Sequence, residues 1–144
     1  MEGLPRWIEV GAARDPVNFI ALLPLEEVAR VLREDGWGEP RVQHAAALEG
    51  RRPAVTLERP LLSALVRLHA RLWADGTVVG NAHLDVPALA PPRHVAFHDV
   101  GKACLMYAFY RRGYAVELVH LANECENHDG RALKVYSRRA GGRP

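Results

Sequence analysis

The chain has 144 residues, of which 49% are hydrophobic and 25% are charged, and this composition is typical of a single folded domain. No apolar run approaches the roughly 18 residues that a membrane-spanning helix needs, and the N-terminus lacks the basic patch and apolar stretch of a signal peptide. We therefore expect one cytoplasmic domain with no membrane partner. Two cysteines without a Cys-x-x-Cys pair exclude a disulfide framework.

The formal net charge is only +2, but the positive charge is unevenly distributed. Arginine supplies nearly all of it, because Lys102 and Lys134 are the only lysines. Arginine offers a planar fork for phosphate and stacks on aromatic rings. Residues 131–144 contain five basic residues and no acidic one, so this end of the chain should carry a positive field. We expect residues 139–144 to form a flexible basic tail.

The first predicted element is a short strand over residues 7–10, ended by a glycine. Residues 18–23 fit either a strand or a helix. Apolar residues at helical spacing and acidic residues in the first turn then predict a helix from Pro24 to about Gly36. Two short apolar runs, 42–48 and 54–57, flank a Gly-Arg-Arg-Pro turn and are consistent with a hairpin.

A helix is predicted from Pro60 to about Ala74. Its leucines recur every three or four residues and would form a core stripe: Leu61, Leu65, Leu68 and Leu72. Residues 77–85 read as a strand.

A further helix is expected from Asp99 to Arg112, with Gly113 as its stop signal. Residues 116–125 and 131–138 follow as strands joined by an Asp129-Gly130 turn. Strands and helices mix without a regular β-α-β rhythm. The sequence therefore predicts a single α+β domain, a mainly antiparallel sheet with three or four helices packed against it.

The helix at 99–112 carries the most informative pattern. Tyr107, Tyr110 and Tyr114 recur at three- and four-residue intervals beside Arg111, so they can share one helical face. One interpretation is a buried helix whose tyrosine hydroxyls reach the edge of the core. A second is the wall of a nucleic-acid-binding cleft, and a third is a subunit interface.

A second aromatic and basic set supports the cleft, because Lys134, Tyr136 and Arg138 alternate on the last predicted strand. We expect bases to stack on Trp73, Tyr107, Tyr110, Tyr114 and Tyr136. The expected phosphate contacts are Arg67, Arg71, Lys102, Arg111, Arg112, Lys134, Arg138 and Arg139. Single-stranded DNA or RNA would be held this way without catalysis, cofactor or metal.

Histidines suggest an alternative function. His83, Asp85, His94 and His98 could form a nitrogen and oxygen ligand set for zinc or manganese, as in a metal-dependent hydrolase or nuclease. The pattern lacks the glutamate of the metalloprotease His-Glu-x-x-His motif. Nucleophile-elbow, P-loop and dinucleotide-loop motifs are also missing from the sequence.

The segment Tyr107-Ala108-Phe109-Tyr110-Arg111-Arg112, the arginine-rich and lysine-poor composition and the mixed order of helices and strands resemble the ThermoDBP-related proteins of hyperthermophilic archaea. The resemblance extends over about residues 60–140. It implies a thermophilic archaeal source, single-stranded nucleic-acid binding in a hydrophobic, basic-edged cleft, and assembly into a homo-oligomer.

Overall fold

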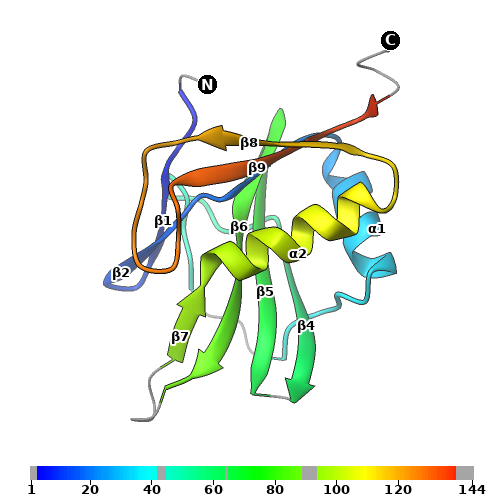
Figure 1. Cartoon of the computed structure of the whole chain (residues 1–144). Coiled ribbons are helices and arrows are strands. Elements are labelled where there is room, and N and C mark those ends of the chain that lie inside the picture. Colours follow the sequence, from blue (N-terminus) through cyan, green and yellow to red (C-terminus); the bar gives the residue numbers. More distant parts are fainter. Residues whose placement is uncertain (1–2, 42–44, 64, 89–93, 139–144) are drawn as a thin grey trace.

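The computed structural model describes residues 3–41, 45–63, 65–88 and 94–138, and it contains more strand than helix (Figure 1). In chain order the elements are β1 (Trp7–Val10), β2 (Ala13–Pro16), β3 (Phe19–Leu22), α1 (Leu25–Glu34), β4 (Val55–Ser63), β5 (Val66–Asp75), β6 (Thr77–Pro87), β7 (His94–Phe97), α2 (His98–Tyr110), β8 (Ala115–His120) and β9 (Arg131–Tyr136). No helix among these residues is long and apolar enough to cross a membrane.

The main sheet has the strand order β4-β5-β6-β3-β9-β8, and β7 also pairs with β6. All of its pairs are antiparallel except β3 with β9, while β1 and β2 form a separate hairpin. The expected α+β class with a mainly antiparallel sheet is confirmed. The expected three or four helices are not, because the described part of the chain contains two.

The predicted helix at 60–74 is wrong, since these residues form the end of β4 and most of β5. A spacing of four residues fits one face of a strand as well as one face of a helix. Leu68 and Leu72 are indeed buried on one face of β5, whereas Leu61 and Leu65 are 43% and 63% exposed. Pro60 is tolerated because β4 is an edge strand with a register irregularity between this residue and Ser63.

The predicted hairpin of 42–48 with 54–57 is also wrong. β4 pairs with β5 instead, and Ala47 forms a bridge to Glu9 near β1. Residues 42–44 lie outside the described part. Five other predicted elements are confirmed: the strands β1, β6, β8 and β9 and the helix α2. α1 is also found where Pro24, Glu26 and Glu27 predicted a helix start. The open choice at 18–23 resolves as β3.

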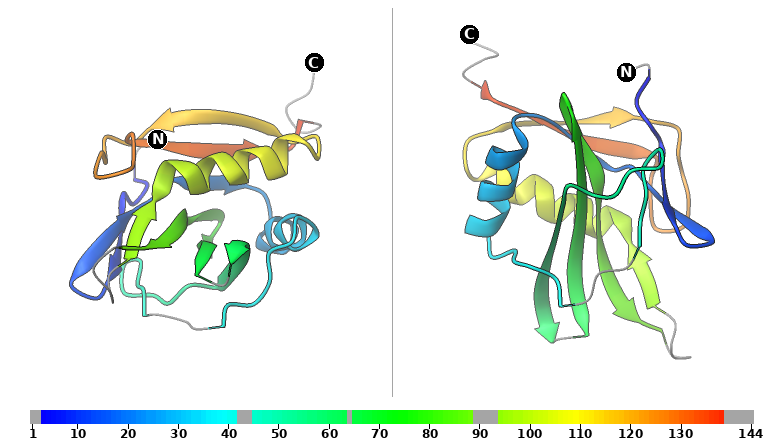
Figure 2. Two further views of the ribbon diagram at one scale, coloured as in Figure 1. Left: turned by 60° about the horizontal axis from the view of Figure 1, so that its bottom comes forward. Right: turned by 180° about the vertical axis from the view of Figure 1, so that it is seen from behind.

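Helix α2 lies between the β8–β9 layer and the β4–β6 layer, so the sheet curves around it (Figure 2, left). Leu105, Ala108 and Phe109 point into this core. Gly101 allows the close approach, because a Cβ at this position would lie 2.4 Å from the backbone oxygen of Ala82 on β6.

The face of β5 and β6 that is turned away from α2 is apolar at one end and polar at the other. Near one end it carries a second apolar cluster, in which Trp73 and Val79 pack with Ile8 of β1 and with Leu48. Residues 45–54, which precede β4, pass over this face (Figure 2, right). Toward the other end the same face carries polar side chains, and most of them are buried.

Candidate functional site

The C-terminal half of α2 presents two aromatic rings to solvent. Tyr107 is 63% exposed and Tyr110 is 58% exposed, and their three-residue spacing places them on neighbouring turns of one helix face. The guanidinium of Arg111 lies 5.3 Å from the centre of the Tyr107 ring, and that of Arg138 lies 5.9 Å from the Tyr110 ring. We call these four residues the tyrosine face.

A shallow hollow of about 510 Å³ lies along α2 beside Tyr107. On the helical side Val100, Ala103 and Cys104 form an apolar strip, with Asp99 at its N-terminal end. Arg59 and Asp35 border it and are paired with each other at 3.1 Å. The tyrosine face therefore continues along the helix as an exposed apolar stripe.

The other predicted tyrosines lie elsewhere. Tyr114 is partly buried, packs edge-on against Phe109 with ring centres 5.5 Å apart, and donates its hydroxyl to Glu27. Burial and this acidic partner raise the pKa of Tyr114. Tyr136 points to the opposite face of β9 from Leu133 and Val135, which pack in the core with α2. Lys134 shares that opposite face, 5.7 Å from the Tyr136 ring.

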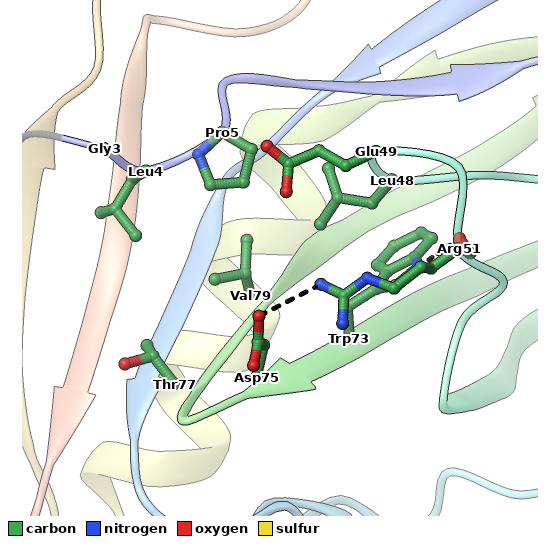
Figure 3. A pocket seen from close by; sticks show the side chains of 10 residues that line it. All are labelled: Gly3, Leu4, Pro5, Leu48, Glu49, Arg51, Trp73, Asp75, Thr77 and Val79. Carbon is green, nitrogen blue, oxygen red and sulfur yellow. Dashed lines mark hydrogen bonds and ion pairs between the residues drawn. The ribbon is translucent and has the colours of Figure 1, made fainter.

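Trp73 is not a surface ring, since only 2% of it is exposed. Its indole N–H donates to the carbonyl of Arg51 at 2.8 Å, beside the Arg51–Asp75 ion pair of 3.7 Å. Figure 3 shows it at a small pocket of about 190 Å³ whose other walls include Leu48 and Val79. The residue is a core anchor, and the structure does not bring it to the tyrosine face.

Four of the predicted phosphate-binding cations hold carboxylates of the protein itself. Their pairs are Arg67 with Glu58 at 2.9 Å, Arg71 with Asp15 at 3.4 Å, Arg112 with Asp35 at 3.0 Å, and Lys102 with Asp129 at 2.6 Å. Arg139 lies outside the described residues. Of the predicted nucleic-acid contacts that the structure describes, Tyr107, Tyr110, Arg111 and Arg138 lie together on one surface, and Lys134 lies with Tyr136 on another.

Four imidazole rings lie one after another at the polar end of the face of β5 and β6 that is turned away from the α2 core. The ring centres of His69 and His83 are 5.5 Å apart, those of His83 and His98 are 5.5 Å apart, and those of His98 and His128 are 6.2 Å apart. All four residues are buried. We call these rings, with the polar residues that contact them, the histidine array.

Asn81 connects the centre of the array. Its side-chain oxygen lies 2.8 Å from Nδ1 of His83, and its amide nitrogen lies 3.1 Å from Nδ1 of His98. The same nitrogen donates to the carbonyl of Pro16 at 2.7 Å. Asp15 closes this end, with a carboxylate oxygen 3.9 Å from Nε2 of His98.

Burial dominates the electrostatics of the array. Desolvation lowers the pKa of His69, His98 and His128, and it lowers the pKa of His83 well below its ordinary value. Desolvation also raises the pKa of Asp15, although His98 and Arg71 partly oppose this effect. The rings are therefore neutral near pH 7, and each keeps one nitrogen lone pair for an acceptor or ligand role.

The predicted ligand set of His83, Asp85, His94 and His98 is divided by the structure. Asp85 Oδ2 lies 3.7 Å from Nδ1 of His94, while His83 and His98 contact each other through their rings and Asn81. The unexpected neighbour of Asp85 is His69, whose Nε2 is also 3.7 Å from Oδ2. His94 and His98 both line a hollow of about 320 Å³ that also contains Arg14 and Cys125.

The sequence interpretation missed His69, Asn81 and Asp15. A signal was present, because polar residues alternate with apolar ones along 67–71 and 81–85, which is the pattern of a strand with one polar face. Reading 60–74 as a helix placed His69 on a different side from Arg67 and Arg71 and concealed this face.

A further group of ligand-type atoms, from Asp99, His128 and Asp129, lies within 4.8 Å of one another. The ammonium of Lys102 lies among them, 3.0 Å from Asp99 and 2.6 Å from Asp129, and also donates to the carbonyl of Arg131. A cation of the protein therefore already neutralises these carboxylates.

No protein-family profile matches the chain, and comparisons with curated proteins and with solved structures give no match.

Proposed function

We propose that the protein binds single-stranded nucleic acid, DNA or RNA, on the tyrosine face of α2. The observation that supports this proposal is the exposure of Tyr107 and Tyr110 on adjacent helical turns, each with a guanidinium group near its ring. One exposed aromatic ring needs no special explanation. Two such rings, each with a guanidinium group over it, place aromatic and positively charged groups on one surface, which is the combination that binds unpaired strands by stacking and charge.

The chemistry of this surface favours an unpaired strand over a duplex. Stacking of a base on a tyrosine contributes about 1–3 kcal/mol and requires a base face that is free of its neighbours. Arg111 and Arg138 can pair with phosphates of the same strand, and no carboxylate partner is found for either among the residues that the structure describes. The site is small, which fits sequence-independent binding of a short stretch.

Fluorescence anisotropy with labelled single-stranded DNA, single-stranded RNA and duplex DNA across a salt series tests the proposal. Tyr107→Ala and Tyr110→Ala should each weaken single-strand binding by about 1–3 kcal/mol at every salt concentration. Arg111→Ala should instead reduce the slope of log affinity against log salt by about 0.7, the value for one lost phosphate contact on a single strand.

Matched controls lie on the other face of β9. Tyr136→Ala and Lys134→Ala remove the same kinds of side chain from a surface that does not adjoin α2, so they should leave affinity and salt slope unchanged. Equal losses in both sets would show diffuse charge attraction instead of a site. If Tyr107→Ala and Tyr110→Ala leave binding intact but convert an oligomer into monomers, the tyrosine face is a subunit interface.

A further inference from the structure

Two nitrogens of the histidine array lack a hydrogen-bond partner among the described residues: Nδ1 of His128, 3.6 Å from the Asp99 oxygen that Lys102 contacts, and Nε2 of His69. Nε2 of His69 is buried, the His69 side chain is only 8% exposed, and no donor or acceptor within the described part of the chain bonds to this atom. An unpaired buried polar atom costs about 1–3 kcal/mol, so its persistence calls for an explanation. A bound ligand at Nε2 would provide one.

The unpaired nitrogen of His69 lies near a carboxylate oxygen of Asp85, which in turn lies near a nitrogen of His94. Asp85 Oδ2 lies 3.7 Å from Nε2 of His69 and 3.7 Å from Nδ1 of His94, both too long for hydrogen bonds. The three residues come from the adjacent strands β5, β6 and β7. Asp85 is the diagonal cross-strand neighbour of both histidines, because His69 pairs with His83 and His94 pairs with Pro87.

We propose that His69, Asp85 and His94 bind a divalent transition-metal ion of the zinc class. Two imidazole nitrogens and one carboxylate oxygen are a ligand set that zinc takes in open sites with three protein ligands. Bonds of about 2.0–2.2 Å place neighbouring ligand atoms roughly 3.3–3.6 Å apart in a tetrahedral site. To meet this geometry the two imidazole nitrogens, which lie more than 4.8 Å apart, must approach each other, and the half-exposed side chain of His94 is the one that can turn toward the ion.

The surroundings support these side chains in different ways. The His69 ring stacks on His83, which Asn81 holds by a hydrogen bond of 2.8 Å, so the buried ligand is oriented by its neighbours. His94 is 46% exposed and also lines the hollow of about 320 Å³. An ion can therefore enter from the His94 side, and the hollow leaves room for water or a further ligand.

We do not assign the metal site to the cluster of Asp99, His128 and Asp129. Lys102 already supplies a positive charge at its centre. Arg67 is the cross-strand partner of Asp85 but its guanidinium is paired with Glu58, and within the described part of the chain the ion-pair contacts of Asp85 are with His69 and His94. The carboxylate of Asp85 thus keeps its charge for an ion.

Titration of metal-free protein with zinc against a chromophoric chelator, and with cobalt followed by its visible absorption, tests the site. The wild type should bind one ion per chain with the spectrum of a four-coordinate nitrogen and oxygen site. His94→Ala and Asp85→Asn should lower zinc affinity by at least about 100-fold, because loss of a mere supporting partner costs 10–100-fold. Zinc should raise the unfolding temperature of the wild type and not of these variants.

His120→Ala is the matched control, since His120 is an exposed histidine on β8, and it should bind zinc as the wild type does. Asp99→Asn should likewise leave affinity unchanged. Wild-type protein that shows no saturable binding of one ion overturns the proposal. So does a His94→Ala variant that loses no more affinity than His120→Ala. Neither measurement depends on nucleic-acid binding, so this site stands or fails separately from the tyrosine face.

Discussion

The tyrosine face and the histidine array use similar polar and aromatic groups under opposite physical conditions. Tyr107 and Tyr110 lie in solvent at the C-terminal end of α2, and the guanidinium groups over their rings come from Arg111 at the helix C-cap and Arg138 two residues after β9. The histidine rings are buried where β5, β6 and the start of α2 meet. Side chains of the tyrosine face can be substituted without disturbing the fold, whereas the histidine array is part of the folded core.

Gly101→Ala should have the largest effect on stability. Gly101 lies on α2 between His98 of the histidine array and Tyr107 of the tyrosine face. The added methyl group would lie 2.4 Å from backbone atoms of Ala82 and His83, so α2 must move away from β6. We expect unfolding free energy to fall by about 3 kcal/mol, at the upper end for overpacking. Urea denaturation measures this loss. Ala103→Ser, at an exposed position on the same helix, should stay within about 0.5 kcal/mol of wild type.

Asn81→Ala should have the next largest effect and act on the array alone. The substitution leaves Nδ1 of His83 and the carbonyl of Pro16 without their Asn81 partner inside the protein. Unsatisfied buried groups cost about 1–3 kcal/mol each, so we expect a loss near 2–3 kcal/mol in urea denaturation. A loss smaller than that of an average surface substitution would show that water reaches these groups and that the array is not sealed.

Acidification should weaken the fold through the array. Burial holds the pKa of His83 well below that of an unfolded histidine, so between the folded pKa and about pH 6.5 the unfolded chain binds more protons. The contribution of His83 to stability is then fully present above about pH 6.5. It decreases as the pH is lowered, by up to about 1.4 kcal/mol per pH unit for this one residue. Denaturation midpoints between pH 8 and 5 measure the slope, and a flat profile contradicts the expected neutral ring.

Tyr107→Ala and Tyr110→Ala should have the smallest effect on stability. Both rings are mostly exposed, and removal of such side chains changes the free energy of unfolding by no more than about 0.5 kcal/mol. Thermal unfolding checks this outcome. A loss of several kcal/mol would mean that the tyrosines are structural, and the contrast between the two regions would disappear.

Strong local signals explain which parts of the fold were predicted correctly. Gly113 follows α2, and the acidic residues after Pro24 open α1. The strand predicted at 77–85 corresponds to β6, whose residues 78–83 are buried. The helix predicted at 60–74 failed because Leu68 and Leu72 satisfy both periodicities, and pairing of β5 with β4 and β6 decided between them.

The two candidate sites differ in how far the sequence could predict them. The spacing of Tyr107, Tyr110 and Arg111 placed them on one helix face, but it left open whether that face is buried. Burial depends on what packs against the helix. The apolar side with Leu105, Ala108 and Phe109 is the side that packs into the core. The histidine array was only partly anticipated, because His69 meets Asp85 across a strand pairing that no local pattern specifies.

The amino-acid sequence by itself determined the α+β class, the position of both helices and the strands at each end of the chain, because turn residues, helix termini and apolar periodicity act over a few neighbouring residues. The tertiary structure alone decided that Trp73 is a core anchor, that Arg67, Arg71 and Arg112 are paired with carboxylates, and that four neutral imidazoles lie in contact. These outcomes depend on which distant strands pair and on how much water their pairing excludes.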